Sequence, residues 1–150
     1  MTGTALEGTL AWFWFGLAIV AGLVFGSFAS VLVTRIPEKK KISGRSQCFE
    51  CKSTLGWFEN LPVLSFLLQK GRCRTCHASL PRLYPVLELS MAALFIAPFL
   101  LFHSWLQIIT WIAFSVLGLP LAVIDVRHHR LPDTLTRALL ILVILIAALY

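Results

Sequence analysis

Residues 105–124, WLQIITWIAFSVLGLPLAVI, are twenty consecutive positions without a charged side chain. An α-helix rises about 1.5 Å per residue and the hydrocarbon layer of a bilayer is about 30 Å thick, so about 20 apolar residues suffice to cross it. This stretch therefore predicts a transmembrane helix. The charged sequence DVRHHR begins directly after it, at Asp125.

Two further stretches meet the same criterion, Leu10–Val33 and Leu83–Phe102, and Glu88 is the single charge within them. A fourth, Ala138–Tyr150, has thirteen residues and would span only about 20 Å as a helix. We expect it to be a truncated span and the chain to be the N-terminal part of a longer protein. The composition is 58% hydrophobic and 13% charged with a mean hydropathy of +0.83, which excludes an ordinary water-soluble domain.

These segments predict an all-α integral membrane protein with three complete transmembrane helices, a truncated fourth and one large polar loop. The expected units are residues 1–33, an external N-terminus with the first helix, and residues 34–82, the loop. Residues 83–150 form helices two to four. The sequence Gly22-x-x-x-Gly26 in the first helix permits close helix packing. We expect that packing inside the bundle rather than in a dimer.

The basic residues predict the orientation. Ten of the thirteen Lys and Arg residues lie between Arg35 and Arg82, beside three acids, and cytoplasmic loops carry such an excess. The loop should therefore be cytoplasmic and the N-terminus external. The other three cations, Arg127, Arg130 and Arg137, follow the third helix. Because the second and third helices each cross the membrane once, these cations lie on the same side as the loop. A net charge of +6 suits an anionic lipid surface, and no nucleic-acid-binding motif accompanies it.

The loop contains two Cys-x-x-Cys pairs, Cys48 with Cys51 and Cys73 with Cys76, separated by 21 residues. Two such turns can supply four sulfurs to one tetrahedral ion, and this spacing is close to that of zinc ribbons. Neighbouring Lys and Arg side chains favour the thiolate form. We predict a structural Zn²⁺ bound by all four cysteines, which would stabilise a unit too small for a hydrophobic core of its own.

Two alternatives exist for the cysteines. Disulfides are disfavoured in a reducing cytoplasm. The sequence Cys73-Arg74-Thr75-Cys76-His77 also matches the Cys-x-x-Cys-His form of c-type haem attachment. Haem attachment would require an external loop and would leave the first cysteine pair unexplained. The apolar segment 57–68 between the pairs is expected to pack on the bilayer or on the helix bundle.

Asp125 is the second informative residue. Carboxylates at the edge of a membrane span usually have a function, although an ion pair with Arg127 or Arg130 would also account for it.

The remaining polar residues near the spans have structural interpretations. Asp133 is placed to cap the fourth helix, and His128 and His129 are expected to be solvated at the interface. Glu88 is expected either to pair with Arg82 or to contact the cysteine loop.

Several motifs together resemble the N-terminal half of the type IV prepilin peptidase family, over residues 20 to 140. The matching stretches are Gly26-Ser27-Phe28 with Arg35-Ile36-Pro37, ENLPVLS at 59–65, GRCRTC at 71–76, RLYPVLEL at 82–89, Ile124-Asp125 and LPDTLT at 131–136. Two positions depart from the family pattern: Ser30 stands where Asn is usual, and Leu83 is inserted between the Arg and the Tyr.

The resemblance implies a bifunctional enzyme of type IV pilus or type II secretion systems, located in a bacterial inner membrane. Family members cleave the basic leader of prepilins or pseudopilins at the cytoplasmic face and methylate the new N-terminus with S-adenosylmethionine. Asp125 matches the first of two catalytic aspartates. The second lies in a Gly-x-Gly-Asp motif of the C-terminal half, and these 150 residues contain no such motif. We therefore expect this chain to be inactive alone and to need that half as a partner.

The resemblance assigns no cofactor-binding residues. No Rossmann glycine motif is present, and the loop around Gly71 is the region expected to serve methyl transfer. A non-enzymatic alternative is a membrane-anchored zinc-ribbon module that recruits partners in a pilus or secretion assembly. It would need the metal but not Asp125.

Overall fold

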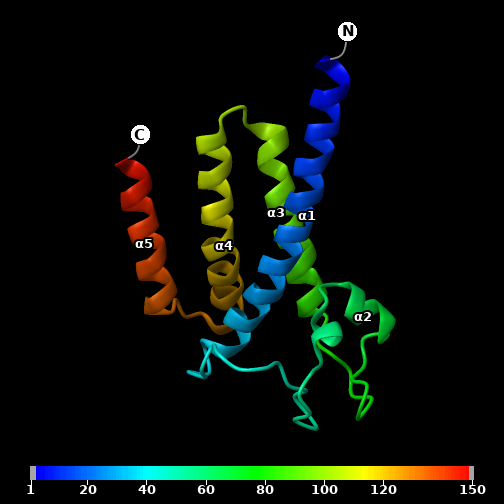
Figure 1. Ribbon diagram of the computed structural model, residues 1–150. Helices are drawn as coiled ribbons and strands as arrows, with labels where there is room; N and C mark the ends of the chain where they lie inside the picture. The colour runs from blue at the N-terminus through cyan, green and yellow to red at the C-terminus, as the bar shows by residue number, and fades with distance from the viewer. Residues whose placement is uncertain (1–2, 149–150) are drawn as a thin grey trace.

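The computed structural model describes residues 3–148, with side chains from residue 12 onward. The elements are α1 (Gly3–Arg35), the 3-10 helix η1 (Trp57–Asn60), α2 (Leu64–Leu68), α3 (Leu83–Leu101), α4 (Trp105–His128) and α5 (Asp133–Ala147) (Figure 1). Three helices are long and apolar enough to cross a membrane: Trp12–Arg35, Leu83–Leu101 and Trp105–His128. Over the described residues only two isolated β-bridges occur, so the predicted all-α membrane architecture is confirmed.

Several helix boundaries differ from the predicted spans: α1 extends beyond Leu10–Val33 at both ends, and α3 ends at Leu101 rather than at Phe102. The two differences that bear on the site lie in α4 and α5. α4 continues past Ile124 to His128, and α5 begins at Asp133 rather than at Ala138. Hydropathy locates the part of a helix that suits lipid, whereas backbone hydrogen bonding extends into the polar flanks. α4 ends where His129 turns into the left-handed region at φ 48° and its amide donates to the Asp125 carbonyl. Asp125 therefore lies in the last turn of α4.

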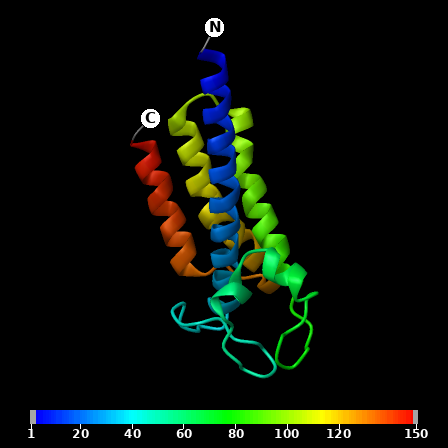
Figure 2. The same cartoon turned by 45° about the vertical axis from the view of Figure 1, so that its right-hand side comes forward.

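The α1 glycines allow direct backbone contact with α3. A Cβ atom added to Gly22 would lie 2.5 Å from the Ala92 Cα, and one added to Gly26 would lie 2.5 Å from the Glu88 Cα. Helices approach this closely only where side chains are absent. The glycine pair thus packs α1 against α3 within one chain, as predicted, and the two helices run side by side in both side views (Figures 1 and 2).

A proline in α3 creates a specific contact with α4. Pro98 has no amide hydrogen, so the Leu94 carbonyl four residues earlier loses its helical partner. The Trp111 Nε1 donates to that carbonyl at 3.0 Å. A free carbonyl in lipid is costly, and a neighbouring helix is the usual means of satisfying it.

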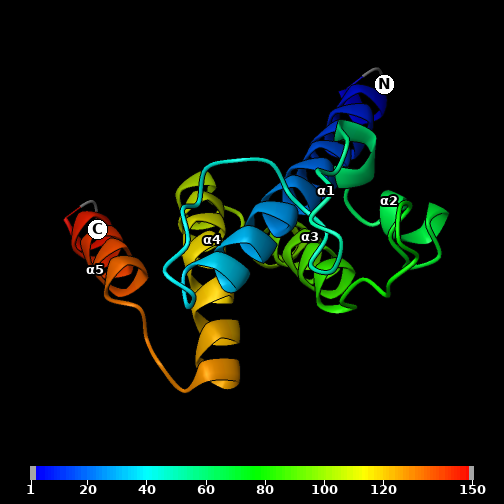
Figure 3. The same cartoon turned by 90° about the horizontal axis from the view of Figure 1, so that it is seen from below.

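The polar segments gather at one end of the bundle. The loop between α1 and α3 and the turn between α4 and α5 lie at the same end, opposite the start of α1 (Figure 1). A cluster of buried residues joins all four long helices there: Leu32, Val33, Leu87, Ile124 and Leu135. Seen from below, α2 lies on the α3 side and α5 on the other (Figure 3).

Arg35, at the end of α1, holds the first part of the loop beneath the bundle. Its guanidinium donates to four backbone carbonyls over 2.9–3.2 Å, those of Lys41, Ile42, Ser43 and Arg45. These hydrogen bonds from one side chain therefore fix the path of a basic stretch that forms no helix or strand.

Candidate metal centre and carboxylate sites

Each cysteine pair lies in a turn with the same backbone hydrogen bonds, and the second turn repeats the first at an offset of 25 residues. In each, the amide of the first cysteine donates to the carbonyl of the residue five positions later, and the carbonyl of that cysteine accepts from the amide of the residue after the second cysteine. The bonds are Cys48 N to Ser53 O, Lys52 N to Cys48 O and Leu55 N to Ser46 O, then Cys73 N to Ala78 O, His77 N to Cys73 O and Leu80 N to Gly71 O. An isolated β-bridge closes each turn.

The two turns bring the four sulfurs together. All four Sγ atoms lie within 4.8 Å of one another; Cys48 and Cys76 are 3.7 Å apart, and Cys51 and Cys73 are 3.9 Å apart. A tetrahedral zinc site with 2.3 Å Zn–S bonds requires sulfurs about 3.8 Å apart. The cysteines are therefore placed to hold a metal ion, and their separation is that of ligands rather than of bonded sulfurs.

Backbone groups set the protonation of the sulfurs. The amides of Cys76 and Thr75 lower the pKa of the Cys73 thiol to about 6, and hydrogen bonds from Ser53 lower the pKa of Cys51. The Ala78 amide also lowers the pKa of Cys76, but partial burial and the neighbouring thiols outweigh it and raise that pKa to about 11. Metal binding near neutral pH must therefore displace protons from part of the site.

His77 has a conformational role in the second turn. Its φ is 57°, and Lys52, at the equivalent position of the first turn, has a φ of 58°. Each residue follows the second cysteine of its own pair and has a left-handed backbone conformation. This equivalence accounts for the Cys-x-x-Cys-His sequence without haem, and the sulfur cluster consists of the four cysteines alone among the described residues.

Gly71, in the region expected to serve methyl transfer, has a local structural requirement. Its φ is 66°, and an added Cβ would lie 2.9 Å from the Phe66 Cζ. Its amide and carbonyl both take part in hydrogen bonds, with the Phe66 carbonyl and the Leu80 amide. A glycine is thus required at this position by the conformation of the backbone that leads into the second cysteine turn.

Glu88 connects the cysteine loop to the membrane helices. Its carboxylate Oε2 accepts a hydrogen bond of 2.6 Å from the Val63 amide, and its side chain is buried. Val63 has a φ of 59° and is the centre of a γ-turn in which the Leu64 amide donates to the Pro62 carbonyl. Of the two predicted roles for Glu88, contact with the loop is therefore confirmed. The ion pair with Arg82 is not among the contacts of the described chain, whose single salt bridge joins Lys40 to Glu38.

Asp125 is exposed beside the buried Ile124, at the same end of the bundle as the cysteines. The alternative of an ion pair with Arg127 or Arg130 is absent from the described residues. A cavity of about 420 Å³ lies near this end and is lined by Asp133 among other residues, but not by Asp125. These two aspartates therefore do not share that cavity.

The predicted cap at Asp133 is wrong. α5 has Pro132 at its N-cap position, with no side-chain cap hydrogen bond, and Asp133 is the first helical residue. From that position its carboxylate complements the positive end of the helix dipole instead. With Pro132 at the cap, the helix starts one residue earlier than a cap at Asp133 would place it.

Comparison with known proteins identifies the family. The model of the Bacterial Peptidase A24 N-terminal domain matches residues 20–102, which include α1 from its eighteenth residue, the complete cysteine loop and α3. The chain belongs to this family. The family assignment thus covers the contact between α1 and α3 and both cysteine turns.

Similar curated proteins are named "Prepilin leader peptidase/N-methyltransferase". Those of Myxococcus xanthus and Klebsiella pneumoniae are both 34% identical, over 91% and 85% of this chain and 41% and 59% of their own lengths. That of Bacillus subtilis is 36% identical, over 78% of this chain and 48% of its own length. The chain thus spans about half the length of these relatives. No solved structure matches it.

Proposed function

We propose that this chain contributes the metal-binding loop and the first catalytic carboxylate of a prepilin leader peptidase and N-methyltransferase. The observation that carries this proposal is the position of Asp125. It is an exposed carboxylate in the last turn of a membrane-spanning helix, at the same end as the cysteine turns. The names of the relatives, prepilin leader peptidase/N-methyltransferase, support prepilins as the substrate class and N-methylation as a second activity. We propose pseudopilins as further substrates and S-adenosylmethionine as the methyl donor, on the resemblance of the motifs alone.

The proposed peptidase chemistry uses two carboxylates that share one proton. One activates water, and the other donates to the scissile carbonyl. Asp125 is proposed as one member of this pair. Asp125 does not line the nearby cavity of about 420 Å³, and no Gly-x-Gly-Asp motif occurs in the sequence. We propose that the second carboxylate belongs to the C-terminal half of the relatives' length, and that this chain alone does not cleave.

The proposed orientation places the loop end in the bacterial cytoplasm. Both clusters of basic residues lie at one end of the bundle (Figure 1), and the positive-inside rule assigns such an end to the cytoplasm. Cleavage of a basic leader at that face is consistent with a carboxylate at the end of α4. The metal is proposed to be Zn²⁺ with a structural role, because the four sulfurs leave no ligand position for substrate.

The test replaces Asp125 in the full-length protein. Asp125→Asn should lower the rate of prepilin cleavage by roughly 10²-fold or more, since it removes a group that transfers protons. Asp133→Asn is the matched control, an aspartate eight residues away that should leave cleavage within about threefold of the parent rate. Cleavage is measured by the mass of the pilin, and metal content confirms that both variants retain the loop. Normal cleavage by the Asp125 variant would refute the catalytic assignment.

A further inference from the structure

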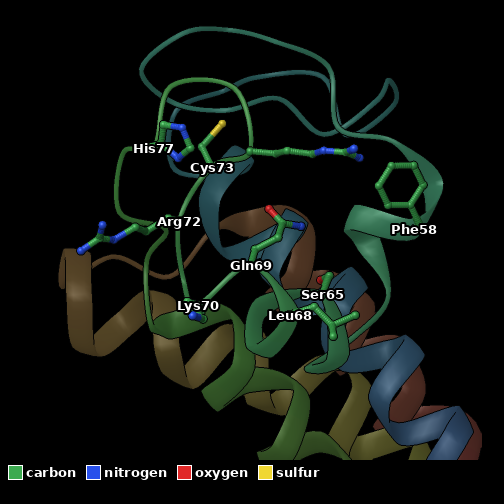
Figure 4. Close-up of a pocket in the computed structure, with 9 residues that line it drawn as sticks. Phe58, Ser65, Leu68, Gln69, Lys70, Arg72, Cys73 and His77 are labelled. Carbon is green, nitrogen blue, oxygen red and sulfur yellow. The ribbon is translucent and has the colours of Figure 1, made fainter.

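A groove in the cysteine loop has basic and apolar walls. Its volume is about 680 Å³, and it lies between the η1–α2 segment and the second cysteine turn. The cations that line it are Lys70, Arg72 and Arg74, and no carboxylate does. Figure 4 shows Phe58 and Leu68 on one side and His77 and Cys73 on the other, with Arg72 pointing outward at the rim. The groove therefore presents positive charge next to apolar surface.

The apolar wall continues onto an exposed ridge, which we define as residues 57–68. Trp57, Leu64, Leu67 and Leu68 are 80%, 51%, 65% and 74% exposed. Several large apolar side chains exposed on one short loop segment indicate a contact with lipid or protein. Two residues serve both features, because Phe58 and Leu68 belong to the ridge and also line the groove.

The anchor at Glu88 determines the depth of the ridge. α3 has 19 residues and is about 28 Å long, so nearly all of it is needed to cross a hydrocarbon layer of about 30 Å. Glu88 lies about 8 Å along this helix from its first residue. Since its carboxylate binds the Val63 amide, the middle of the ridge is held beside the first two turns of α3, at the depth where a spanning helix of this length would meet the headgroup layer. Figure 1 accordingly shows α2 beside the start of α3.

We propose that the groove binds the phosphodiester headgroup of an anionic phospholipid whose acyl chains lie along the ridge. Arginine and lysine side chains supply charge-assisted hydrogen bonds to phosphate oxygens. The buried Gln69 Oε1 has no hydrogen-bond donor among the described residues, and Gln69 lines the groove (Figure 4). A headgroup hydroxyl, such as that of phosphatidylglycerol, would supply this donor. A basic leader peptide would be repelled by the same cations.

This inference does not depend on prepilin cleavage, and the experiment measures lipid binding directly. Full-length protein is titrated with phosphatidylglycerol and, separately, with phosphatidylcholine, and bound lipid is counted by native mass spectrometry. The test variant is Lys70→Gln with Arg72→Gln and Arg74→Gln. The matched control removes the same charge elsewhere in the loop, at residues 39–41, with three Lys→Gln changes. The same spectra report whether each variant retains its metal.

Phosphatidylglycerol affinity should fall at least tenfold in the groove variant and less than threefold in the control, because each basic residue near an anionic lipid contributes about 1 kcal/mol. Equal losses in both variants, or none in either, would overturn the groove site. Inorganic phosphate should compete weakly. Competition by phosphate as effective as that of the lipid would show a site for free anions and would refute the lipid assignment.

A second measurement tests the ridge. A photoreactive benzoylphenylalanine replaces Trp57 in one protein and Phe49 in another. Phe49 is also an exposed aromatic residue of the loop, but it lies in the first cysteine turn. Illumination in phosphatidylglycerol-containing vesicles should give a lipid adduct from position 57 and none from position 49. A protein adduct in place of lipid at position 57, or equal lipid labelling at both positions, would overturn the proposal.

Discussion

Replacing Gly26 by alanine tests whether the contact between α1 and α3 holds the bundle together. The added Cβ would lie 2.5 Å from the Glu88 Cα and 3.0 Å from the Leu87 carbonyl oxygen. Backbone atoms cannot rotate away, so the helices must separate by about 1 Å to restore van der Waals distances of about 3.5 Å. Overpacking of this kind costs about 1–3 kcal/mol.

The matched control is Gly16→Ala in the same helix, where an added Cβ meets nothing within 4 Å. Alanine is favoured over glycine in a helix by about 1 kcal/mol, and this gain applies to both variants. The difference in unfolding free energy between the two variants therefore isolates the contact. We expect Gly26→Ala to be less stable than Gly16→Ala by about 1–3 kcal/mol.

The free energy is measured by titration of the purified protein with dodecyl sulfate in mixed micelles, followed by circular dichroism. Gly22→Ala, which would place its Cβ 2.5 Å from the Ala92 Cα, should behave like the Gly26 variant. Equal stability of the Gly26 and Gly16 variants, within about 0.5 kcal/mol, would refute the close contact, since that is the usual range of neutral surface changes.

Three further predictions concern the cysteine loop. Cys48→Ser should abolish stoichiometric zinc and expose the loop to proteolysis while the helices still insert; unchanged zinc by elemental analysis would contradict the four-cysteine site. His77→Gly should retain the metal and raise stability by up to about 1 kcal/mol, because glycine adopts a positive φ without strain; metal loss would make His77 a ligand. Glu88→Ala should accelerate amide exchange around Val63, since it removes a buried hydrogen bond worth about 1.5–3 kcal/mol, whereas Glu88→Gln should keep exchange nearer the parent rate. Identical exchange in both Glu88 variants would argue against the anchor.

Much of the membrane architecture could be predicted from composition. The spans at 83–101 and 105–128 begin at the predicted residues, because the change from polar to apolar residues is abrupt at each start. Their ends were less predictable. The helix through Asp125 continues for a further turn of polar residues until His129 adopts a left-handed conformation, and hydropathy carries no information on that step.

The cluster of four cysteines was predictable from the sequence, but the structural repeat of its two turns was not. Cys-x-x-Cys spacing is set by the geometry of a single turn, so it can be recognised locally. The equivalence of Lys52 and His77 could be recognised only from the backbone conformation, because the two turns share few residues beyond the cysteines. The pattern Ser-Thr-Leu at 53–55 and Ala-Ser-Leu at 78–80 is the one sequence signal that could have indicated it.

By itself, the sequence determined the apolar spans, the two Cys-x-x-Cys pairs and the family, because each depends on residues close together in the chain. Only the tertiary structure decided which distant groups meet. Examples are Gly26 against the Glu88 backbone, the Glu88 carboxylate with the Val63 amide, and Trp111 with the carbonyl that Pro98 leaves free. These contacts depend on the relative height and rotation of packed helices, which an apolar sequence surrounded by lipid does not specify.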